Sequence, residues 1–396
     1  MMNLRTLRGP ALALAAAAAV LAPSGARAQS LLASRGLGYS LEPMDARARA
    51  LGGIGLGLPG ANFSLVNPAG TVGLAAPALV IAFQPDFYRT ETSAGRNTGT
   101  TARFPLIHAV FPIGRRFAGS VGYGSFLDQH WQTETSDTVL IGGTPRGVKD
   151  RFLSAGAVAR LRVGGGYLLS SRLAVGAAVD VLTGSARDSV TRTFTDSAST
   201  LAATVYGTDW SYGGVGFAGG VRWNPVEPVN LSVAVAGGGH IRADAGSDTL
   251  AANRTYPRPI AVDLGASGRV APNTTLAVAG RWMQWSKASD ALVASGGARD
   301  LRSASAGVEF GGFSLGGRNL PLRVGGRWTE LPFAWGTATT AGEFPTEKAL
   351  SAGLGARLAG GAALVDFTGE RGKRAAGAAF DESYWRLSLS LTLLGR

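Results

Sequence analysis

The chain has 396 residues, a formal net charge of +12 and no cysteine, and only 16% of its residues are charged. The lack of cysteine excludes disulfides and thiolate metal sites. Arginine carries most of the positive charge, but no Lys/Arg-rich run or nucleic-acid module accompanies it, which argues against nucleic-acid binding. The charged fraction lies well below the usual ~25%, which indicates that much of the surface does not face water.

The first 28 residues have the pattern of a secretory signal peptide. Arg5 and Arg8 form a short positive region, an apolar run follows over 11–22, and Ala26-Arg27-Ala28 supplies a cleavage site. The apolar run is shorter than the ~20 residues that a membrane helix needs, and no later stretch reaches that length. The sequence therefore predicts export, with cleavage after Ala28.

Apolar and polar residues alternate in many segments after residue 75. Alternation is unbroken over 385–393 and recurs at 260–269, 322–328 and 350–358, so that each strand would have one apolar and one polar face. We expect about fourteen strands, near 76–86, 102–113, 117–127, 151–166, 172–183, 212–224, 229–241, 258–270, 274–286, 301–313, 322–331, 348–358, 362–370 and 383–394.

The connections between these strands alternate in length. Long loops are expected at 87–101, 128–150, 184–211, 242–257, 287–300, 332–347 and 371–382, and short turns lie between the other strands. A soluble sandwich would show the same alternation but has no reason to gather its long loops at one end, whereas an outer-membrane barrel does. The sequence predicts an all-β fold, a transmembrane antiparallel β-barrel of about 14 strands over 75–396.

The even strand number has a consequence for orientation. Both termini would lie at the end with the short turns, which is the periplasmic side in the outer membrane of a Gram-negative-type cell. Nine aromatic residues near strand ends suggest interfacial girdles: Phe83, Phe87, Tyr88, Tyr123, Trp223, Trp282, Trp285, Trp328 and Trp385.

Residues 29–74, between the signal peptide and the first strand, lack sustained alternation but are too apolar for a plain linker. They contain Leu51-Gly52-Gly53 and, after a spacer, Asn67-Pro68-Ala69-Gly70. This arrangement resembles the N-terminal hatch of the FadL/TodX family of outer-membrane channels. The resemblance implies a hatch segment over 29–74 that folds back and plugs the barrel, with Leu51, Gly52, Gly53, Asn67, Pro68, Ala69 and Gly70 as hatch or gating residues.

The same motif can be interpreted without the family. Asn67 before Pro68 favours an extended or turn conformation, and Gly70 permits a tight bend, so an ordinary turn leading into the first strand is the alternative. A barrel of this strand number is wider than its own side chains can fill, which favours the plug.

Charged residues share the polar face of the strands and are expected in the lumen, where basic groups outnumber acidic ones. The candidate ligand-binding residues are Arg269, Arg281, Arg323, Arg327, Arg357 and Arg386, since a guanidinium suits carboxylate groups. The alternative is that these arginines form ion pairs across the barrel and hydrogen bonds to the hatch. Many of them could do both.

Pro105 lies inside the second expected strand, where it removes a backbone donor. It could mark a lateral opening through which an apolar ligand leaves for the membrane. The alternative is a β-bulge near the loops.

No catalytic constellation stands out, because the three histidines (His108, His130 and His240) have no local Ser or acid at a telling spacing. We expect no enzyme activity, metal site or cofactor. The family resemblance implies passive uptake of hydrophobic or amphipathic small molecules, fatty-acid-like or aromatic, gated by the hatch, with outer-membrane lipid as the other partner. Two alternatives are an open diffusion porin and a PorV-like barrel, a type that looks similar at the hatch and serves as a protein partner in secretion or surface attachment.

Overall fold

The computed structural model describes residues 30–60, 62–93, 95–195, 201–246, 251–315, 317–337 and 340–395. The expected signal peptide lies outside these residues. Among them, no helix is both long and apolar enough to cross a membrane.

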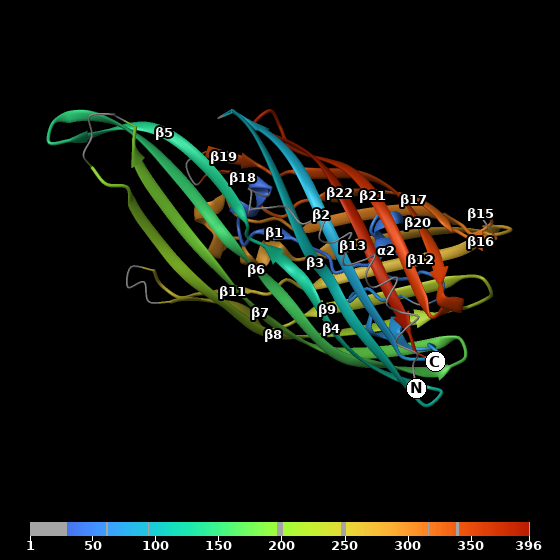
Figure 1. The fold of residues 1–396 in the computed structure, drawn as a ribbon. Helices are drawn as coiled ribbons and strands as arrows, with labels where there is room; N and C mark the ends of the chain where they lie inside the picture. The colour runs from blue at the N-terminus through green and yellow to red at the C-terminus, as the bar shows by residue number, and fades with distance from the viewer. Residues whose placement is uncertain are drawn as a thin grey trace.

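Within the described residues, fourteen antiparallel strands form a closed barrel (Figure 1). They are β2 (Ala78–Thr92), β3 (Gly95–Ile113), β4 (Phe117–Asp128), β6 (Thr144–Ser170), β7 (Leu173–Phe194), β8 (Thr204–Trp223), β9 (Asn230–Gly237), β12 (Ala261–Ala271), β13 (Thr274–Met283), β14 (Leu301–Phe310), β17 (Leu322–Glu330), β20 (Thr346–Leu358), β21 (Ala363–Ala376) and β22 (Phe380–Leu394). Each pairs with the next, and β22 pairs with β2, which closes the barrel. The expected all-β barrel of about 14 strands is confirmed.

Shorter elements decorate the barrel. The extra strands are β5 (Trp131–Ile141), β10 (His240–Ala245), β11 (Arg254–Pro257), β15 (Ser314–Leu315), β16 (Arg318–Asn319), β18 (Trp335–Thr337) and β19 (Thr340–Glu343). Three 3₁₀ helices join barrel strands: η3 (Trp285–Ala288), η4 (Asp290–Ser295) and η5 (Ala359–Gly361). We call the end of the barrel with the short turns the turn end and the opposite end the loop end.

The polarity of the barrel is the reverse of that in a soluble protein. On β17, Leu322, Val324 and Trp328 are exposed, whereas Arg323 and Arg327 are buried on the inner face. Other strands repeat this pattern with exposed Val, Leu and Phe. An apolar outer surface around a charged interior is the arrangement that a lipid environment stabilises.

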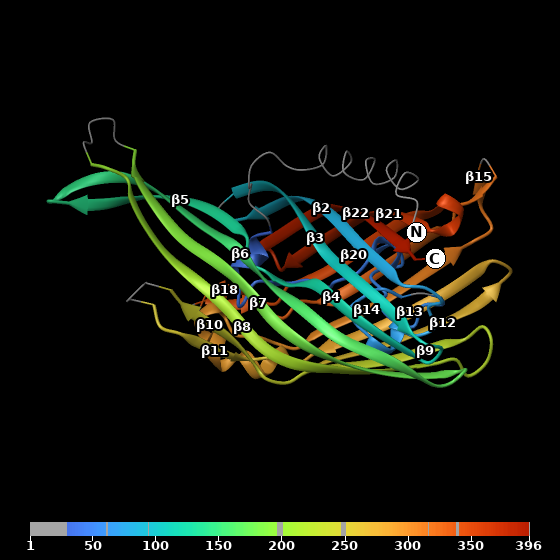
Figure 2. The same cartoon turned by 60° about the horizontal axis from the view of Figure 1, so that its bottom comes forward.

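Several segments expected to be loops are strands instead. β2 and β3 stay paired as far as Thr92 and Gly95, and β21 and β22 continue to the turn at 377–379. β6, β7 and β8 extend beyond their neighbours, and together with β5 they form an arm at the loop end (Figures 1 and 2). In the arm, alternation fades because both faces of each strand meet water, while the backbone pairing continues. In the extended parts of β2, β21 and β22 one face stays buried, as at Thr90, Arg374 and Glu382.

Residues 30–74, which we call the plug, lie inside the barrel in both views (Figures 1 and 2). The elements of the plug are η1 (Leu31–Ser34), β1 (Tyr39–Ser40), α2 (Ala46–Ala50) and η2 (Pro68–Thr71). Three aromatic residues expected at the interfaces are buried instead: Phe83, Tyr88 and Trp285. Tyr88 lies on the inward side of β2 and Trp285 in η3, whereas Phe83 lies on the outward side of β2 and is covered by Phe104, with ring centres 5.3 Å apart.

Candidate functional site: the plugged lumen

The first half of the plug is built around α2. The Asp45 carboxylate accepts a hydrogen bond from the Ala48 amide at 2.8 Å and so caps the helix. Burial raises the pKa of this carboxyl group, because the charged form loses water. After the helix, Gly52 and Gly53 have φ values of 82° and 85°, which an L side chain rarely adopts. A Cβ on Gly52 would also lie 2.5 Å from the Gly326 carbonyl oxygen, so glycine lets this turn touch the wall.

The second half of the plug depends on the Asn67-Pro68-Ala69-Gly70 motif. The Asn67 side chain accepts a hydrogen bond from the Ala69 amide at 2.8 Å, which caps η2. Its amide nitrogen donates to the Val221 carbonyl of β8 at 3.0 Å. Asn67 therefore shapes the turn and fastens it to the barrel wall.

Inward side chains of the barrel bond to the backbone of the plug. Ser351 donates to the Ala50 carbonyl at 3.0 Å, Thr368 to Ala46 at 2.5 Å, Ser267 to Gly57 at 2.6 Å and Arg162 to Leu65 at 2.5 Å, and His108 Nδ1 lies 2.8 Å from the Phe63 carbonyl. A buried carbonyl without a partner is costly, so these bonds define where the plug rests.

Glycines on the inner face of the wall allow the plug to pack closely. A Cβ on Gly325 would lie 2.2 Å from the Gly52 nitrogen, and a Cβ on Gly176 would lie 2.4 Å from the Ala69 nitrogen. Similar contacts with plug atoms occur at Gly122, Gly124, Gly166, Gly220, Gly265, Gly307 and Gly353. Part of the high glycine content, 58 residues, therefore makes room for the plug.

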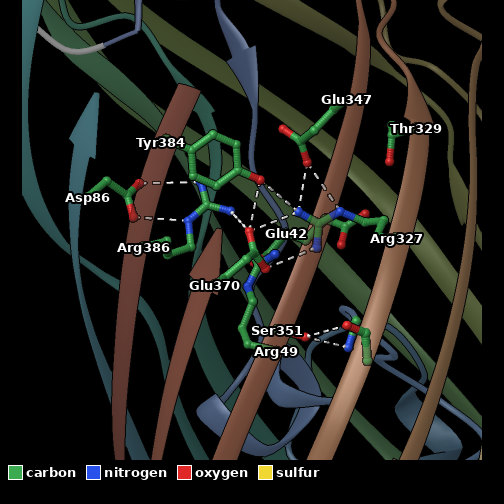
Figure 3. Close-up of polar contacts among 12 residues, drawn as sticks. Glu42, Arg49, Asp86, Arg327, Thr329, Glu347, Ser351, Glu370, Tyr384 and Arg386 are labelled. Atoms are coloured by element: carbon green, nitrogen blue, oxygen red, sulfur yellow. Dashed lines mark hydrogen bonds and ion pairs between the residues drawn. The ribbon is translucent and has the colours of Figure 1, made fainter. Parts of the chain in front are cut away.

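One side of the lumen carries a network of ion pairs, which we call the charged wall. Its members are Asp86, Arg103, Arg327, Glu347, Glu370, Arg374, Glu382 and Arg386, from β2, β3, β17, β20, β21 and β22. Figure 3 shows Arg386 between Asp86 and Glu370, with Arg327 between Glu370 and Glu347. The pair distances range from 2.6 Å for Arg374 and Glu347 to 3.1 Å for Arg327 and Glu370. Four arginines thus balance four carboxylates, which compensates the loss of water around each charge.

The start of the plug is attached to the charged wall. The Ser30 hydroxyl donates to Glu382 at 2.7 Å, and the Tyr39 hydroxyl donates to Glu347 at 2.7 Å. The Arg374 guanidinium lies 4.1 Å from the centre of the Tyr39 ring, a cation–π contact. Burial raises the pKa of Tyr39 to about 12, so the hydroxyl keeps its proton as a donor.

The structure places the six predicted lumen arginines in two groups. Four are held in ion pairs: Arg281 with Asp263 and Glu42, Arg323 with Glu309 and Asp366, Arg327 with Glu347 and Glu370, and Arg386 with Asp86 and Glu370. Arg269 and Arg357 lie on the inward side of β12 and β20 but are exposed at the turn end. The first group matches the alternative of ion pairs, although these pairs join strands of the same side of the barrel, or the wall and the plug, and do not cross the lumen.

The wall opposite the charged wall, formed by β6, β7 and β8, has fewer carboxylates. Asp180 lies 2.6 Å from Arg162 and 2.5 Å from Arg258, and all three are buried. Arg160 also faces the lumen nearby but has no hydrogen-bond or ion-pair partner in the part of the chain that the structure describes. Positive charge is therefore in excess on this side.

The pairing between β3 and β4 is incomplete. It covers only Leu106–Ile113 of β3, although β3 continues back to Gly95 beside β2. Pro105 lies at a β-bulge in the β2–β3 ladder, and β4 has its own irregularity opposite β6, between Ser125 and Leu127. We call the unpaired stretch the seam.

Two structures bridge the seam. Arg103 of β3 lies 2.9 Å from Asp86 and 3.2 Å from Asp128 at the end of β4. Strand β1 of the plug pairs with the free edge of β4, with Tyr39 opposite Asp128 and Ser40 opposite Leu127. The plug therefore occupies the position beside β4 that β3 has left.

Apolar side chains fill the loop end of the lumen next to the seam. Leu37 of the plug packs there with Phe126, Leu127, Trp285 and Phe333. Trp285 is fully buried, and its ring centre lies 5.1 Å from that of Phe333. A cavity of about 150 Å³ adjoins this cluster. Its lining includes the aromatic residues Trp131, Trp210, Tyr212 and Tyr256 and the charged residues Asp188 and Arg254.

Sequence reasoning missed much of this site. It did not single out Arg103, Glu347, Glu370, Arg374 or Glu382, and it assigned residues 371–382 to a loop. Arg374 keeps the spacing of the inward positions Asp366 and Glu370 on β21, and Glu382 keeps that of Arg386 on β22. This continued period of two is the signal that could have found them. Among the described residues, no group of three or more potential metal ligands occurs.

Comparisons with known proteins agree with the architecture. No protein-family model and no curated protein matches the chain. Among solved structures, the CymD monoaromatic hydrocarbon channel has 17% identity and a TM-score of 0.57, and the match covers 91% of this chain and 98% of CymD. A Pseudomonas aeruginosa FadL homologue has 12% identity and a TM-score of 0.61, with 90% and 99% covered. The Pseudomonas putida toluene transporter TodX has 13% identity and a TM-score of 0.57, with 90% and 98% covered. The resemblance predicted from the hatch sequence is confirmed as a likeness of fold.

Proposed function

We propose that this chain, which shares the plugged-barrel fold of the CymD, FadL and TodX channels, takes up hydrophobic or amphipathic small molecules passively across the outer membrane. The observation that carries the proposal is a closed 14-strand barrel whose lumen is blocked by an ordered N-terminal segment. An open diffusion porin would leave a water-filled lumen. A plugged lumen fits a substrate that binds on one side of the plug and passes only when the plug moves.

The apolar outer surface supports placement in the outer membrane of a Gram-negative-type cell. With fourteen strands, the first and last barrel strands begin and end at the turn end. The turn end would face the periplasm, because short periplasmic turns and longer external connections are typical of such barrels. The loop-end cavity would then face the outside.

The loop end offers a route for an apolar ligand. The cavity with Trp131, Trp210 and Tyr256 would receive the molecule, and the cluster around Trp285 would take it further in. A cavity of about 150 Å³ has room for a benzene-sized molecule. The substrate class that fits is a small aromatic compound or the end of an acyl chain.

The seam would be the place where the ligand leaves. Pro105 and its bulge lie where β3 parts from β4, so only the Arg103 bridge and strand β1 close the wall there. Movement of β1 away from β4 would open a lateral path from the apolar cluster to the membrane lipid. The same proposal includes gating by the hatch residues. The plug would move about the Gly52-Gly53 turn and about Asn67, which is hydrogen-bonded to the wall.

A disulfide between plug and wall tests this mechanism, because the natural chain has no cysteine. Ser40 and Leu127 lie directly opposite each other in the β1–β4 ladder, which suits the short distance between paired cysteines. In Gram-negative cells that express Ser40→Cys/Leu127→Cys, we expect oxidation to slow protein-dependent uptake of radiolabelled toluene by about tenfold or more, since gating limits passage. A reductant should restore the rate.

Each single-cysteine variant is the matched control, and its rate of toluene transport should be the same with and without the oxidant. An oxidised double variant that transports at the wild-type rate would contradict gating by β1. Wild-type cells that take up toluene no faster than cells without the protein would contradict the channel function itself.

The arm of β5 to β8 favours a second candidate, a PorV-like role as a partner in secretion or surface attachment. Among the described residues β5 pairs only with β6, so its outer edge over Trp131–Ile141 is available to another strand. Shortening the arm around residues 138–147 should leave toluene uptake unchanged if the channel function is correct, and should abolish surface display of a cargo protein if the second candidate is.

A further inference from the structure

A second cavity lies at the turn end of the barrel, on the far side of the plug from the loop-end cavity. Its volume is about 290 Å³. The lining consists of plug residues Leu58, Val72 and Leu74 and of wall residues Arg222, Asn224 and Asn230. This volume is larger than the ~150 Å³ that holds benzene, so a small organic molecule fits.

Arg222 is the only charged residue in the lining of this cavity. Arg222 is the second-last residue of β8, at the turn end, and its side chain points into the lumen. It has no hydrogen-bond or ion-pair partner in the part of the chain that the structure describes. Glu227, in the turn that follows, is exposed and forms no ion pair with Arg222 within that same part. All the N–H groups of this guanidinium remain available to a ligand.

The other polar groups of the lining are already engaged. Asn224 donates to the Val229 carbonyl at 3.3 Å and to the side chain of Asn230. Asn230 donates to the Pro228 carbonyl at 3.4 Å and to Ser267 at 3.3 Å. A ligand would therefore find one free cation, Arg222, and an apolar surface of Leu58, Val72 and Leu74.

These contacts define the chemistry of the ligand. A planar guanidinium binds a carboxylate with two parallel hydrogen bonds, and an apolar body would cover the leucine and valine side chains. On the charged wall every arginine is paired with carboxylates of the protein, whereas here the structure supplies none.

We propose that the turn-end cavity is a binding site for a small organic anion, a carboxylate on an aromatic ring or a short aliphatic chain, with Arg222 as the residue that recognises it. Binding at this site does not depend on the proposed uptake function. Only the role of the site rests on the proposed uptake function: the site would hold an amphipathic substrate that has passed the plug. An anionic substrate would then leave through the turn end and a neutral one through the seam.

Binding of 4-fluorobenzoate to the full detergent-solubilised protein, followed by fluorine NMR, tests the site. We expect saturable binding to the wild type and a dissociation constant at least about tenfold higher in Arg222→Gln, which loses the charge-assisted hydrogen bonds. The neutral 4-fluorobenzyl alcohol should bind at least about tenfold more weakly than the benzoate to the wild type.

Arg115→Gln is the matched control, because Arg115 is an exposed residue of a short turn at the same end and its loss changes the net charge equally. It should bind 4-fluorobenzoate like the wild type. Leu74→Trp, which fills the cavity and keeps the charge, should also lose binding. Circular dichroism and heat-modifiable gel mobility verify that each variant is folded.

Equal affinity of Arg222→Gln and wild type for the benzoate, equal affinity of the wild type for acid and alcohol, or no saturable binding would each overturn the proposal. Toluene uptake by the same variants separates the two proposals. Uptake that fails in the wild type while benzoate binding persists contradicts the channel function alone, and intact uptake without benzoate binding contradicts the anion site alone.

Discussion

The two sides of the lumen differ in how their buried arginines are paired with carboxylates. On the charged wall, Arg327 and Arg386 each contact two carboxylates, and Glu370 is shared between them. On the opposite wall, Asp180 is shared by Arg162 and Arg258, and Arg160 has no partner among the described residues. The first side has redundant ion pairs, and the second depends on one carboxylate.

This difference separates structural arginines from available ones. A paired guanidinium that has lost its water is held by its carboxylates, and freeing it for a ligand would leave those carboxylates buried and unpaired. Arginine content alone therefore says little about anion binding in a barrel. We therefore expect arginines that bind a ligand on the side of the lumen with fewer carboxylates.

The largest effect should come from the single carboxylate on the opposite wall. Asp180→Asn leaves Arg160, Arg162 and Arg258 together without a counter-charge, and Asp180 is fully buried. We expect the free energy of unfolding, measured by urea titration in lipid vesicles, to fall by about 3–5 kcal/mol. A loss below 1 kcal/mol would mean that water or another group already compensates these charges.

A smaller effect is expected on the charged wall, where the pairs are redundant. In Glu370→Gln, Arg386 keeps Asp86 at 2.9 Å and Arg327 keeps Glu347 at 2.7 Å. The same titration should show a loss of about 1.5–3 kcal/mol, the range for hydrogen bonds to charged groups. Asp381→Asn on β22, which removes an exposed pair with Lys373, is the control and should change stability by less than about 1 kcal/mol. Equal losses in Glu370→Gln and Asp180→Asn would remove the distinction between the walls.

The smallest effect should be found at the exposed arginines of the turn end. Arg357 lies on β20, the strand of Glu347, but it is exposed and forms no ion pair within the described residues. Arg357→Gln should change the free energy of unfolding by no more than about 0.5 kcal/mol. A larger loss would indicate that the ion-pair network extends further toward the turn end than its contacts suggest.

Much of the barrel could be predicted from the sequence, because a strand between lipid and a polar lumen must alternate. The segment 322–331 was expected as a strand, and β17 occupies Leu322–Glu330. The outer halves of β6, β7 and β8 are strands where the sequence predicts loops, because a strand with water on both faces carries polar residues without a pattern. In these outer halves, strand formation depends on backbone pairing with the neighbouring strand, and the pattern of one segment does not show that pairing.

The sequence predicts which arginines face the lumen but not which carboxylates pair with them. The period of two placed Arg323 and Arg386 in the lumen, and burial of both confirms that direction. Their partners could not be assigned, because Asp86 meets Arg386 only after the barrel has closed between β2 and β22, almost the whole barrel apart in sequence. For the same reason, the lack of a partner for Arg222 is visible only in three dimensions.

The arm at the loop end is a rigid extension of the barrel wall. β6 has 27 residues, which at ~3.3 Å per residue corresponds to ~90 Å of continuous strand. About 9–11 residues suffice to cross the apolar core of a tilted barrel, so more than half of β6 projects beyond it. The β5–β6 ladder holds the tip from Thr144 to Ser154, and the β6–β7 ladder runs from Val148 to Ser170 with one irregularity near the turn. A load on the hairpin at 142–143 would therefore reach the lumen wall beside Arg160 and Arg162 without a flexible joint to absorb it.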